Sequence, residues 1–281
     1  MEAAFFDLDK TVIAKASMMA FGREFYREGL IGRRSLLKGL WTQVVYVRRG
    51  ATSDQLAKIR QSVLALIAGW EQARVRSIVT STLAPVLDPI TYAEAIEAIE
   101  EHRGAGRLIV IISAAPEEIV EPLAAYLGVD VAIGSRADVD ERGRYTGHMA
   151  RYAYGQTKAD LMAELAETRG IDLANSWAYS DSVTDLPMLE AVGHPVVVNP
   201  DRSLERLAAA RGWPVRHFDR MVERTEPGLE APGRPLDEPA APRAGRNGKV
   251  GWLLIGAPTV VLLTTGGALW WRRRLIGNGP G

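Results

Sequence analysis

Four polar segments of the chain carry residues suited to phosphate chemistry, and each follows an apolar run or begins a helix-like stretch. They are FFDLDKT with Asp7, Asp9 and Thr11, VIISAAPEE with Ser113, GQTKADL with Lys158, and AYSDSVTD with Asp181 and Asp185. Carboxylates are hard oxygen ligands that suit Mg²⁺. Hydroxyls, an ammonium group and the backbone amides at helix starts can hold phosphate oxygens. The set therefore predicts phosphoryl transfer at a Mg²⁺ site.

Asp7 and Asp9 come directly after the apolar run at the N-terminus. In a strand, residues i and i+2 point to the same face, and two carboxylates there repel unless a cation lies between them or one is protonated. A lone pair of this kind is most often a solvated turn or a cap. Its place at the end of a buried strand favours a ligand site, because ligands in open α/β sheets bind beyond the carboxyl ends of the strands. A carboxylate there can also act as a nucleophile and form an aspartyl-phosphate.

Each of these residues has a plainer explanation when it is taken singly. Thr11 and Ser113 could cap helices, Lys158 could be a surface charge, and Asp185 could complement a helix N-terminus. Their shared position at strand ends and helix starts argues against that explanation for the whole set. No dinucleotide fingerprint follows the first apolar run, and no P-loop motif is present.

Short apolar runs alternate with helix-like stretches through the middle of the chain. The runs are Ala3–Phe6, Leu108–Ile112, Asp130–Ile133, Trp177–Tyr179 and Val196–Val198, and the stretches are Tyr92–His102, Glu117–Leu127, Lys158–Thr168 and Leu186–Val192. Buried runs that alternate with amphipathic helices predict a parallel sheet covered on both faces. We expect an α/β fold with a Rossmann-like core formed by residues 1–14 and 84–221, with a small hairpin at Val139–His148.

Residues 15–83 show apolar side chains three and four positions apart and no strand-like run. A stretch of about 70 residues is too long for an ordinary crossover connection. We therefore expect an all-helical cap inserted after the first strand. The alternative is that these helices belong to the covering layer of the sheet.

The C-terminal part of the chain differs in composition. Residues 222–249 are rich in Pro, Gly and charge, which predicts a disordered linker. Residues 250–271 are uncharged and mostly apolar, with tryptophans near both ends, which is typical of a transmembrane helix. A basic tail, residues 272–281, follows. Basic residues are equally numerous on both sides of residues 250–271, so they do not decide the orientation of this segment. The N-terminus has no export signal. We expect a single-pass protein of the cell membrane with its catalytic domain on the cytoplasmic side and the membrane as a partner.

Composition excludes several classes of function. Lys+Arg and Asp+Glu are equal at 34 each, so the net charge of +0 predicts no nucleic-acid partner. The chain has no cysteine, which excludes disulfides, zinc–thiolate sites and thiol nucleophiles.

The four motifs, in this order, resemble those of the haloacid dehalogenase superfamily of phosphohydrolases. The helical insert after the first motif resembles its phosphoserine-phosphatase-like branch, and the match runs from Ala3 to Arg220. The resemblance implies that Asp7 is the nucleophile and Asp9 the general acid and base. It also implies a mobile cap that closes over a small phosphorylated substrate and excludes water.

The same resemblance assigns ligands. Asp7, the backbone carbonyl of Asp9, and Asp181 would bind Mg²⁺, and Asp185 would orient that site. Thr11, Ser113 and Lys158 would hold the phosphoryl group.

Two departures from the family pattern concern the substrate. Ala16 stands where phosphoserine phosphatases carry a cap glutamate, and Ala114 and Ala115 follow Ser113 where relatives commonly have glycines or a second serine. The resemblance therefore implies a phosphomonoesterase for a small phosphorylated metabolite or a lipid-related phosphate ester rather than for phosphoserine. The alternatives are a phosphotransferase with the same intermediate and a membrane-tethered regulatory protein of the same fold without turnover.

Overall fold

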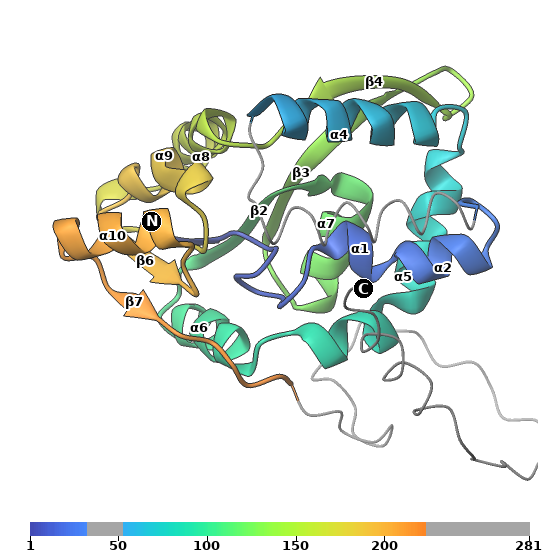
Figure 1. Cartoon of the computed structure of the whole chain (residues 1–281). Coiled ribbons are helices and arrows are strands. Elements are labelled where there is room, and N and C mark those ends of the chain that lie inside the picture. Colours follow the sequence, from blue (N-terminus) through green and yellow to red (C-terminus); the bar gives the residue numbers. More distant parts are fainter. Residues whose placement is uncertain (33–52, 223–281) are drawn as a thin grey trace, which may run out of the picture. The chain divides into compact units, whose positions relative to one another are not determined.

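The computed structural model describes residues 1–32 and 53–222, and seven strands within them form one sheet in the order β4-β3-β2-β1-β5-β6-β7 (Figure 1). The pairs are parallel, apart from the antiparallel pair of β3 with β4. The strands are β1 Ala3–Phe6, β2 Leu108–Pro116, β3 Val131–Val139, β4 Tyr145–Arg151, β5 Trp177–Ser180, β6 His194–Val198 and β7 Val215–Arg216.

Helices cover both faces of this sheet because alternate side chains of each central strand point to opposite sides. Ala4 and Phe6 of β1 pack in one apolar core, which also holds residues of α5, α6 and α7, while Ala3 and Phe5 pack in a second core with residues of α8, α9 and α10. The helices of these layers are α5 Gln72–Leu87, α6 Ala93–Gly104, α7 Glu117–Tyr126, α8 Gln156–Arg169, α9 Leu186–Glu190 and α10 Arg202–Arg211.

The region after β1 is helical, as expected. It contains α1 Ser17–Ala20, α2 Gly22–Arg27, α4 Ser53–Ile67 and the start of α5, and α4 runs alongside β4 (Figure 1). The prediction of a Rossmann-like parallel sheet with a helical cap is therefore confirmed. The alternative holds in part for α5, because Arg76 forms an ion pair with Glu121 of α7 (2.6 Å) and Gln72 donates a hydrogen bond to Glu118 (2.8 Å).

The outer strands of the sheet were predicted less well from the sequence than the central strands. The expected hairpin is present as β3 and β4, and the backbone amide of Asp140 donates a hydrogen bond to the carbonyl of Arg144 (2.8 Å) across the turn. It adds an antiparallel strand to a sheet that we predicted to be parallel. The short edge strand β7 and helix α10 were not predicted. Three short 3₁₀ turns, Asp88–Ile90, Leu173–Asn175 and Val183–Asp185, complete the described elements.

The prediction of a membrane-anchored protein requires correction. In the part of the chain that the structure describes, no helix is both long enough and apolar enough to cross a bilayer. The predicted span, linker and basic tail lie outside the described residues, apart from Val222. The prediction of a single-pass membrane localisation was therefore wrong as it stood. It rested on the apolar run and on the tryptophans near its ends, in a run where Pro258, Gly266 and Gly267 lower helix propensity.

A buried histidine makes the stability of the core sensitive to acid. His102 of α6 is 2% exposed, and its Nε2 lies 2.8 Å from the hydroxyl oxygen of Tyr179. Burial and the nearby Arg107 guanidinium lower the pKa of His102 to about 4. The unfolded chain, where a histidine has its ordinary pKa of about 6.5, therefore binds this proton more readily than the folded chain.

We expect the free energy of unfolding to fall as the pH drops from about 6.5 towards 4, by at most about 1.4 kcal/mol per pH unit from this group. His102→Gln keeps a polar partner for Tyr179 and does not titrate, so its stability should depend less on pH in this range. Urea unfolding of both proteins at pH 7 and pH 5 measures the difference. Parallel pH profiles for the two proteins would assign the acid sensitivity to other groups.

Candidate active site

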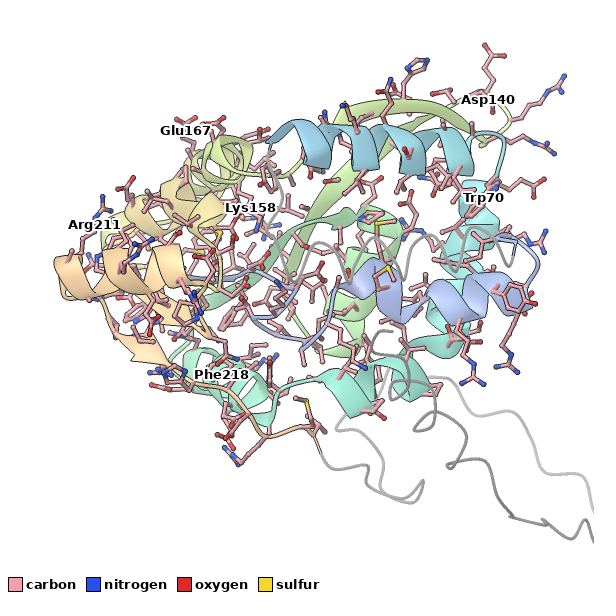
Figure 2. The ribbon with its side chains drawn as sticks, viewed as in Figure 1. Trp70, Asp140, Lys158, Glu167, Arg211 and Phe218 are labelled. Carbon is pink, nitrogen blue, oxygen red and sulfur yellow. The ribbon has the colours of Figure 1, made fainter. Side chains whose placement is uncertain are left out.

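Lys158 joins two buried carboxylates at the centre of the candidate site. Its Nζ donates hydrogen bonds to Asp7 Oδ1 (2.6 Å) and to Asp185 Oδ2 (2.7 Å). Figure 2 shows Lys158 among the side chains inside the molecule, and it is only 2% exposed. Burial would lower the pKa of Lys158, but Asp7 and Asp185 outweigh that effect and raise it. Lys158 is therefore a permanent cation.

The buried position of Asp7 disfavours the charged form of its carboxyl group. It is 6% exposed, and burial raises the pKa of its carboxyl group well above the usual range; Lys158 opposes the shift, while Asp185, Asp181 and Asp9 add to it. The charges of the other three predicted acidic residues therefore all act on Asp7. Among the described residues, the hydrogen bond from Lys158 to Asp7 goes to Oδ1 only. The other carboxyl oxygen of Asp7, Oδ2, is thus the one that can approach another group.

The sheet places these residues by register. Phe6 pairs with Ile111 of β2 and with Tyr179 of β5, and the amide of Asp7 donates to the carbonyl of Tyr179 (2.9 Å). Asp7 and Asp181 consequently follow β1 and β5 directly, and Ser113 lies near the C-terminal end of the neighbouring strand β2, at the same edge of the sheet. That edge is where ligands bind in open α/β sheets.

Asp9 points to a different partner from Asp7. Its Oδ1 accepts a hydrogen bond from the backbone amide of Ser17 at the start of α1 (2.8 Å). We expected both side chains to share one face of a strand. Strand β1 ends at Phe6, however, so its alternation does not extend to Asp9. Burial raises the pKa of Asp9, and the hydrogen bond from the backbone amide of Ser17 opposes the shift.

The two predicted phosphate-binding hydroxyls are both buried. Thr11 is 0% exposed, and its Oγ1 has no hydrogen-bond partner among the described residues. Ser113 Oγ accepts a hydrogen bond from the amide of Ala115 (3.1 Å), which leaves its own proton available as a donor. An unpartnered buried hydroxyl is costly and uncommon. Thr11 therefore has an unused hydrogen-bonding group inside the protein.

Asp181 follows β5 and is 7% exposed. Burial raises the pKa of Asp181 to about 7; Lys10 and Lys158 oppose the shift and Asp185 adds to it. In the described residues no lysine or arginine forms an ion pair with Asp181. A further cation beside the Asp181 carboxylate, in addition to Lys10 and Lys158, would favour its ionised form.

A divalent cation fits this arrangement of donors. The described residues contain no group of three or more acidic or histidine side chains arranged to hold a metal. The predicted ligand set needs only two such side chains, those of Asp7 and Asp181, with the carbonyl of Asp9 as the third. Two buried carboxylates that directly follow adjacent strands fit Mg²⁺, which uses few protein ligands and keeps several waters.

Two residues of the site adopt a left-handed backbone conformation. Gly155 (φ +57°) precedes α8, and Lys10 (φ +65°) follows Asp9. Glycine adopts this conformation without strain, so Gly155 lets the chain enter α8 with Lys158 in its first turn. A non-glycine residue there is uncommon, and Lys10 marks a sharp turn of the chain directly after Asp9.

Two positioning residues were missed in the sequence. Ser17 holds Asp9 through its amide, and Ser180 donates from Oγ to Asp185 Oδ2 (2.8 Å). The signal for Ser180 was its place directly before Asp181 in the motif. No local pattern could have found Ser17, because its contact depends on how α1 lies against the loop after β1.

Comparisons with known proteins identify the family of the chain. The family model described as haloacid dehalogenase-like hydrolase matches residues 4–190. The chain is 49% identical over 235 residues to the inhibition of morphological differentiation protein of Streptomyces azureus. This match covers 83% of the chain and 85% of that protein. It is also 49% identical over 220 residues to a probable phosphatase of Mycobacterium tuberculosis, covering 78% of this chain and 76% of the relative.

Two further matches extend the comparison. A phosphoserine phosphatase of Mycobacterium tuberculosis is 33% identical over 218 residues, covering 77% of this chain and 70% of that enzyme. The crystal structure of a Bordetella pertussis protein of unknown function aligns with a TM-score of 0.66 and 27% identity, covering 76% of this chain and 97% of that one. The chain therefore belongs to the haloacid dehalogenase-like hydrolase family and is a phosphatase of its phosphoserine-phosphatase-like branch.

Proposed function

We propose that this protein is a Mg²⁺-dependent phosphomonoesterase that acts through an aspartyl-phosphate on Asp7. The proposal depends on one observation, the buried cluster in which Lys158 donates hydrogen bonds to both Asp7 and Asp185. Lys158 bonds Oδ1 of Asp7 and does not bond its Oδ2. A carboxylate held by a fixed cation on one oxygen can attack with the other. Thr11 and Ser113, at the same edge of the sheet, would hold the oxygens of the phosphoryl group.

The first step forms one bond and breaks another. Asp7 Oδ2 attacks phosphorus, the bond between phosphorus and the ester oxygen breaks, and the ester oxygen takes a proton from Asp9. The raised pKa of Asp9 favours the protonated form that this role needs. Its hydrogen bond from the amide of Ser17 keeps one carboxyl oxygen occupied, so the other oxygen would carry the proton.

The second step regenerates the enzyme. Asp9, now ionised, takes a proton from a water molecule whose oxygen attacks phosphorus. The bond between phosphorus and Asp7 Oδ2 breaks, which releases inorganic phosphate and restores the carboxylate. If an alcohol takes the place of water, the same residues catalyse phosphotransfer instead.

Asp7, the carbonyl of Asp9, and Asp181 would hold the Mg²⁺. When bound, the ion would neutralise the repulsion between the Asp7 carboxylate and the anionic phosphate and keep both acidic side chains ionised. Asp185 already accepts hydrogen bonds from Lys158 and Ser180, so it is suited to holding Lys158 in place.

Release of phosphate from an aryl phosphate tests the proposal. We expect turnover with Mg²⁺, loss of turnover in excess chelator and recovery when Mg²⁺ is restored in excess. Full activity in excess chelator would contradict the metal assignment, and no phosphate release under any condition would contradict the phosphomonoesterase. Products formed with added glycerol identify the acceptor, because glycerol phosphate appears only with a transferase.

A further inference from the structure

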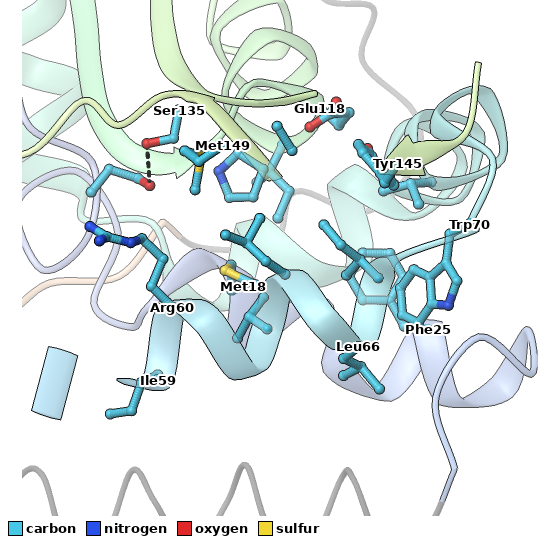
Figure 3. Close-up of a pocket in the computed structure, with 18 of the residues that line it drawn as sticks. Met18, Phe25, Ile59, Arg60, Leu66, Trp70, Glu118, Ser135, Tyr145 and Met149 are labelled. Atoms are coloured by element: carbon cyan, nitrogen blue, oxygen red, sulfur yellow. Dashed lines mark hydrogen bonds between the residues drawn. The ribbon is translucent and has the colours of Figure 1, made fainter. Parts of the chain in front are cut away.

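An apolar cavity of about 310 Å³ lies between the cap helices and the ends of β2, β3 and β4 (Figure 3). Its walls come from α1, α2, α4, α5 and α7 as well as from these strands. Most of its lining side chains are aliphatic, aromatic or thioether groups, including Met18, Phe25, Leu64, Trp70 and Met149. A cavity of this size is at the lower end of the range for small-molecule sites.

None of the predicted site residues lines the cavity, but chain neighbours of Ser113 and of Ser17 do. Ala114 lines it and directly follows Ser113, and Ser135, another lining residue, donates a hydrogen bond to the carbonyl of Ala114 (2.8 Å). Met18 also lines it and directly follows Ser17, whose amide holds Asp9. A phosphate ester held by Ser113 would therefore have its alcohol part at the mouth of this cavity.

Polarity changes along the cavity. Figure 3 shows Arg60 at the end near Ser135, whereas Phe25, Leu66 and Trp70 lie at the opposite end. The Arg60 guanidinium carbon lies 4.6 Å from the ring centre of Tyr152. Arg60 is thus found at the end with Ser135, whose hydroxyl donates to the carbonyl of Ala114, and the opposite end carries large aromatic and aliphatic side chains.

The cavity is poorly matched to an amino acid. Arg60 and Glu118 are its charged lining residues, and Glu118 is 1% exposed and accepts a hydrogen bond from Gln72 (2.8 Å). Arg60 could pair with a carboxylate, but Glu118, the acidic side chain of the lining, already accepts the hydrogen bond from Gln72 and is not free to pair with an ammonium group alone. A zwitterion would be left with an unpaired buried charge, which is costly.

We infer that the substrate is the phosphate monoester of an apolar, chain-like alcohol, with its phosphoryl group at Asp7 and its chain in the cavity. This inference rests on the proposed phosphatase activity and adds the class of leaving group. The apolar walls favour each buried methylene group, while Arg60 faces the anionic end of the molecule.

The kinetic test compares ethyl, hexyl and decyl phosphate with phosphoserine, each below the concentration at which it aggregates. The three alkyl esters have nearly the same leaving-group chemistry, so differences in kcat/KM report binding of the chain. Burial of one methylene group is worth about 0.8 kcal/mol, so kcat/KM should rise by about two- to fourfold per methylene until the cavity is full. Phosphoserine should be a poorer substrate than hexyl phosphate.

A pair of substitutions on α4 locates the chain. Leu66 lines the cavity and is 41% exposed, so Leu66→Gln should fold and should reduce the gain in kcat/KM from hexyl to decyl phosphate. Ala65 is exposed on the same helix and does not line the cavity, so Ala65→Gln should leave that gain unchanged. Equal effects of the two substitutions would contradict the placement.

A binding test separates this inference from the proposed function. Alkyl phosphonates cannot be hydrolysed, and Trp70 in the cavity wall reports their binding by a fluorescence change that Trp70→Phe should remove. Tighter binding of decyl than of ethyl phosphonate supports the inference, and equal binding overturns it. Values of kcat/KM that do not depend on chain length, or that are highest for phosphoserine, overturn the inferred substrate class but not the proposed phosphatase activity. No turnover of any ester overturns the proposed function, and the phosphonate result then decides the inference.

Discussion

Replacing Asp7 by Asn is expected to lower turnover by roughly four to six orders of magnitude, the scale on which removal of a nucleophile acts in other covalent enzymes. The neutral amide cannot attack phosphorus, although it keeps the shape of the side chain. The same substitution should leave the free energy of unfolding unchanged or raise it at pH 7. Burial raises the pKa of Asp7, so its ionised form destabilises the folded chain once the pH exceeds the carboxyl pKa of the unfolded chain. Steady-state phosphate release and urea unfolding measure the two effects.

Asp9→Asn provides the matched comparison. General acid–base catalysis contributes about 10²- to 10⁴-fold, so the loss should be smaller than for Asp7→Asn. An aryl phosphate has a good leaving group and needs little help from an acid in the first step. Asp9→Asn should therefore still phosphorylate Asp7 and stall in the second step, which gives a burst of aryl alcohol equal to the enzyme concentration. Near-normal turnover by Asp7→Asn would refute the covalent mechanism.

The second large effect is expected from Lys158→Met, which removes the cation between Asp7 and Asp185. Each of these carboxylates lies within 2.7 Å of Lys158 Nζ, and all three side chains are buried. Breaking a buried pair by removing one partner typically costs about 3–5 kcal/mol, because a charge is left without compensation. We expect a loss of stability in that range together with loss of turnover.

A double variant separates the two consequences of this substitution. Lys158→Met combined with Asp185→Asn removes one of the uncompensated charges, and Ser180 can still donate to the amide oxygen. Much of the lost stability should return, whereas turnover should not, since the phosphoryl group still lacks its cation. Lys58→Met, an exposed position on α4, is the control for loss of a lysine. If the double variant regained activity, Lys158 would be a structural residue only.

The centre of the fold and the list of acidic residues were predictable because they depend on short-range patterns. Ala3–Phe6 is a continuous apolar run, which is typical of a strand buried on both faces, and all four residues are buried. Asp7 and Asp181 follow such strands directly. Parallel pairing then brings their ends to one edge of the sheet, so spacing along the chain was enough to predict that these residues meet.

The edges of the fold and the C-terminus were predicted less well because their signals are weaker. Strand β7 has two residues and both are exposed, so no apolar run marks it. The apolar segment 250–271, with tryptophans near both ends, led to the prediction of a membrane localisation, and that localisation is contradicted.

Within the site, only the tertiary structure decided which partner each side chain has. Asp7 and Asp9 are two positions apart, yet one meets Lys158 from α8 and the other meets the amide of Ser17. Burial at the sheet edge sets the pKa of Asp181 near 7, which no property of its neighbours in sequence indicates. The apolar cavity likewise forms from segments as distant as Met18 and Tyr152. Sequence spacing determined which chemical groups the chain brings to the site, whereas desolvation and cavity shape depend on the surrounding atoms, which only long-range packing supplies.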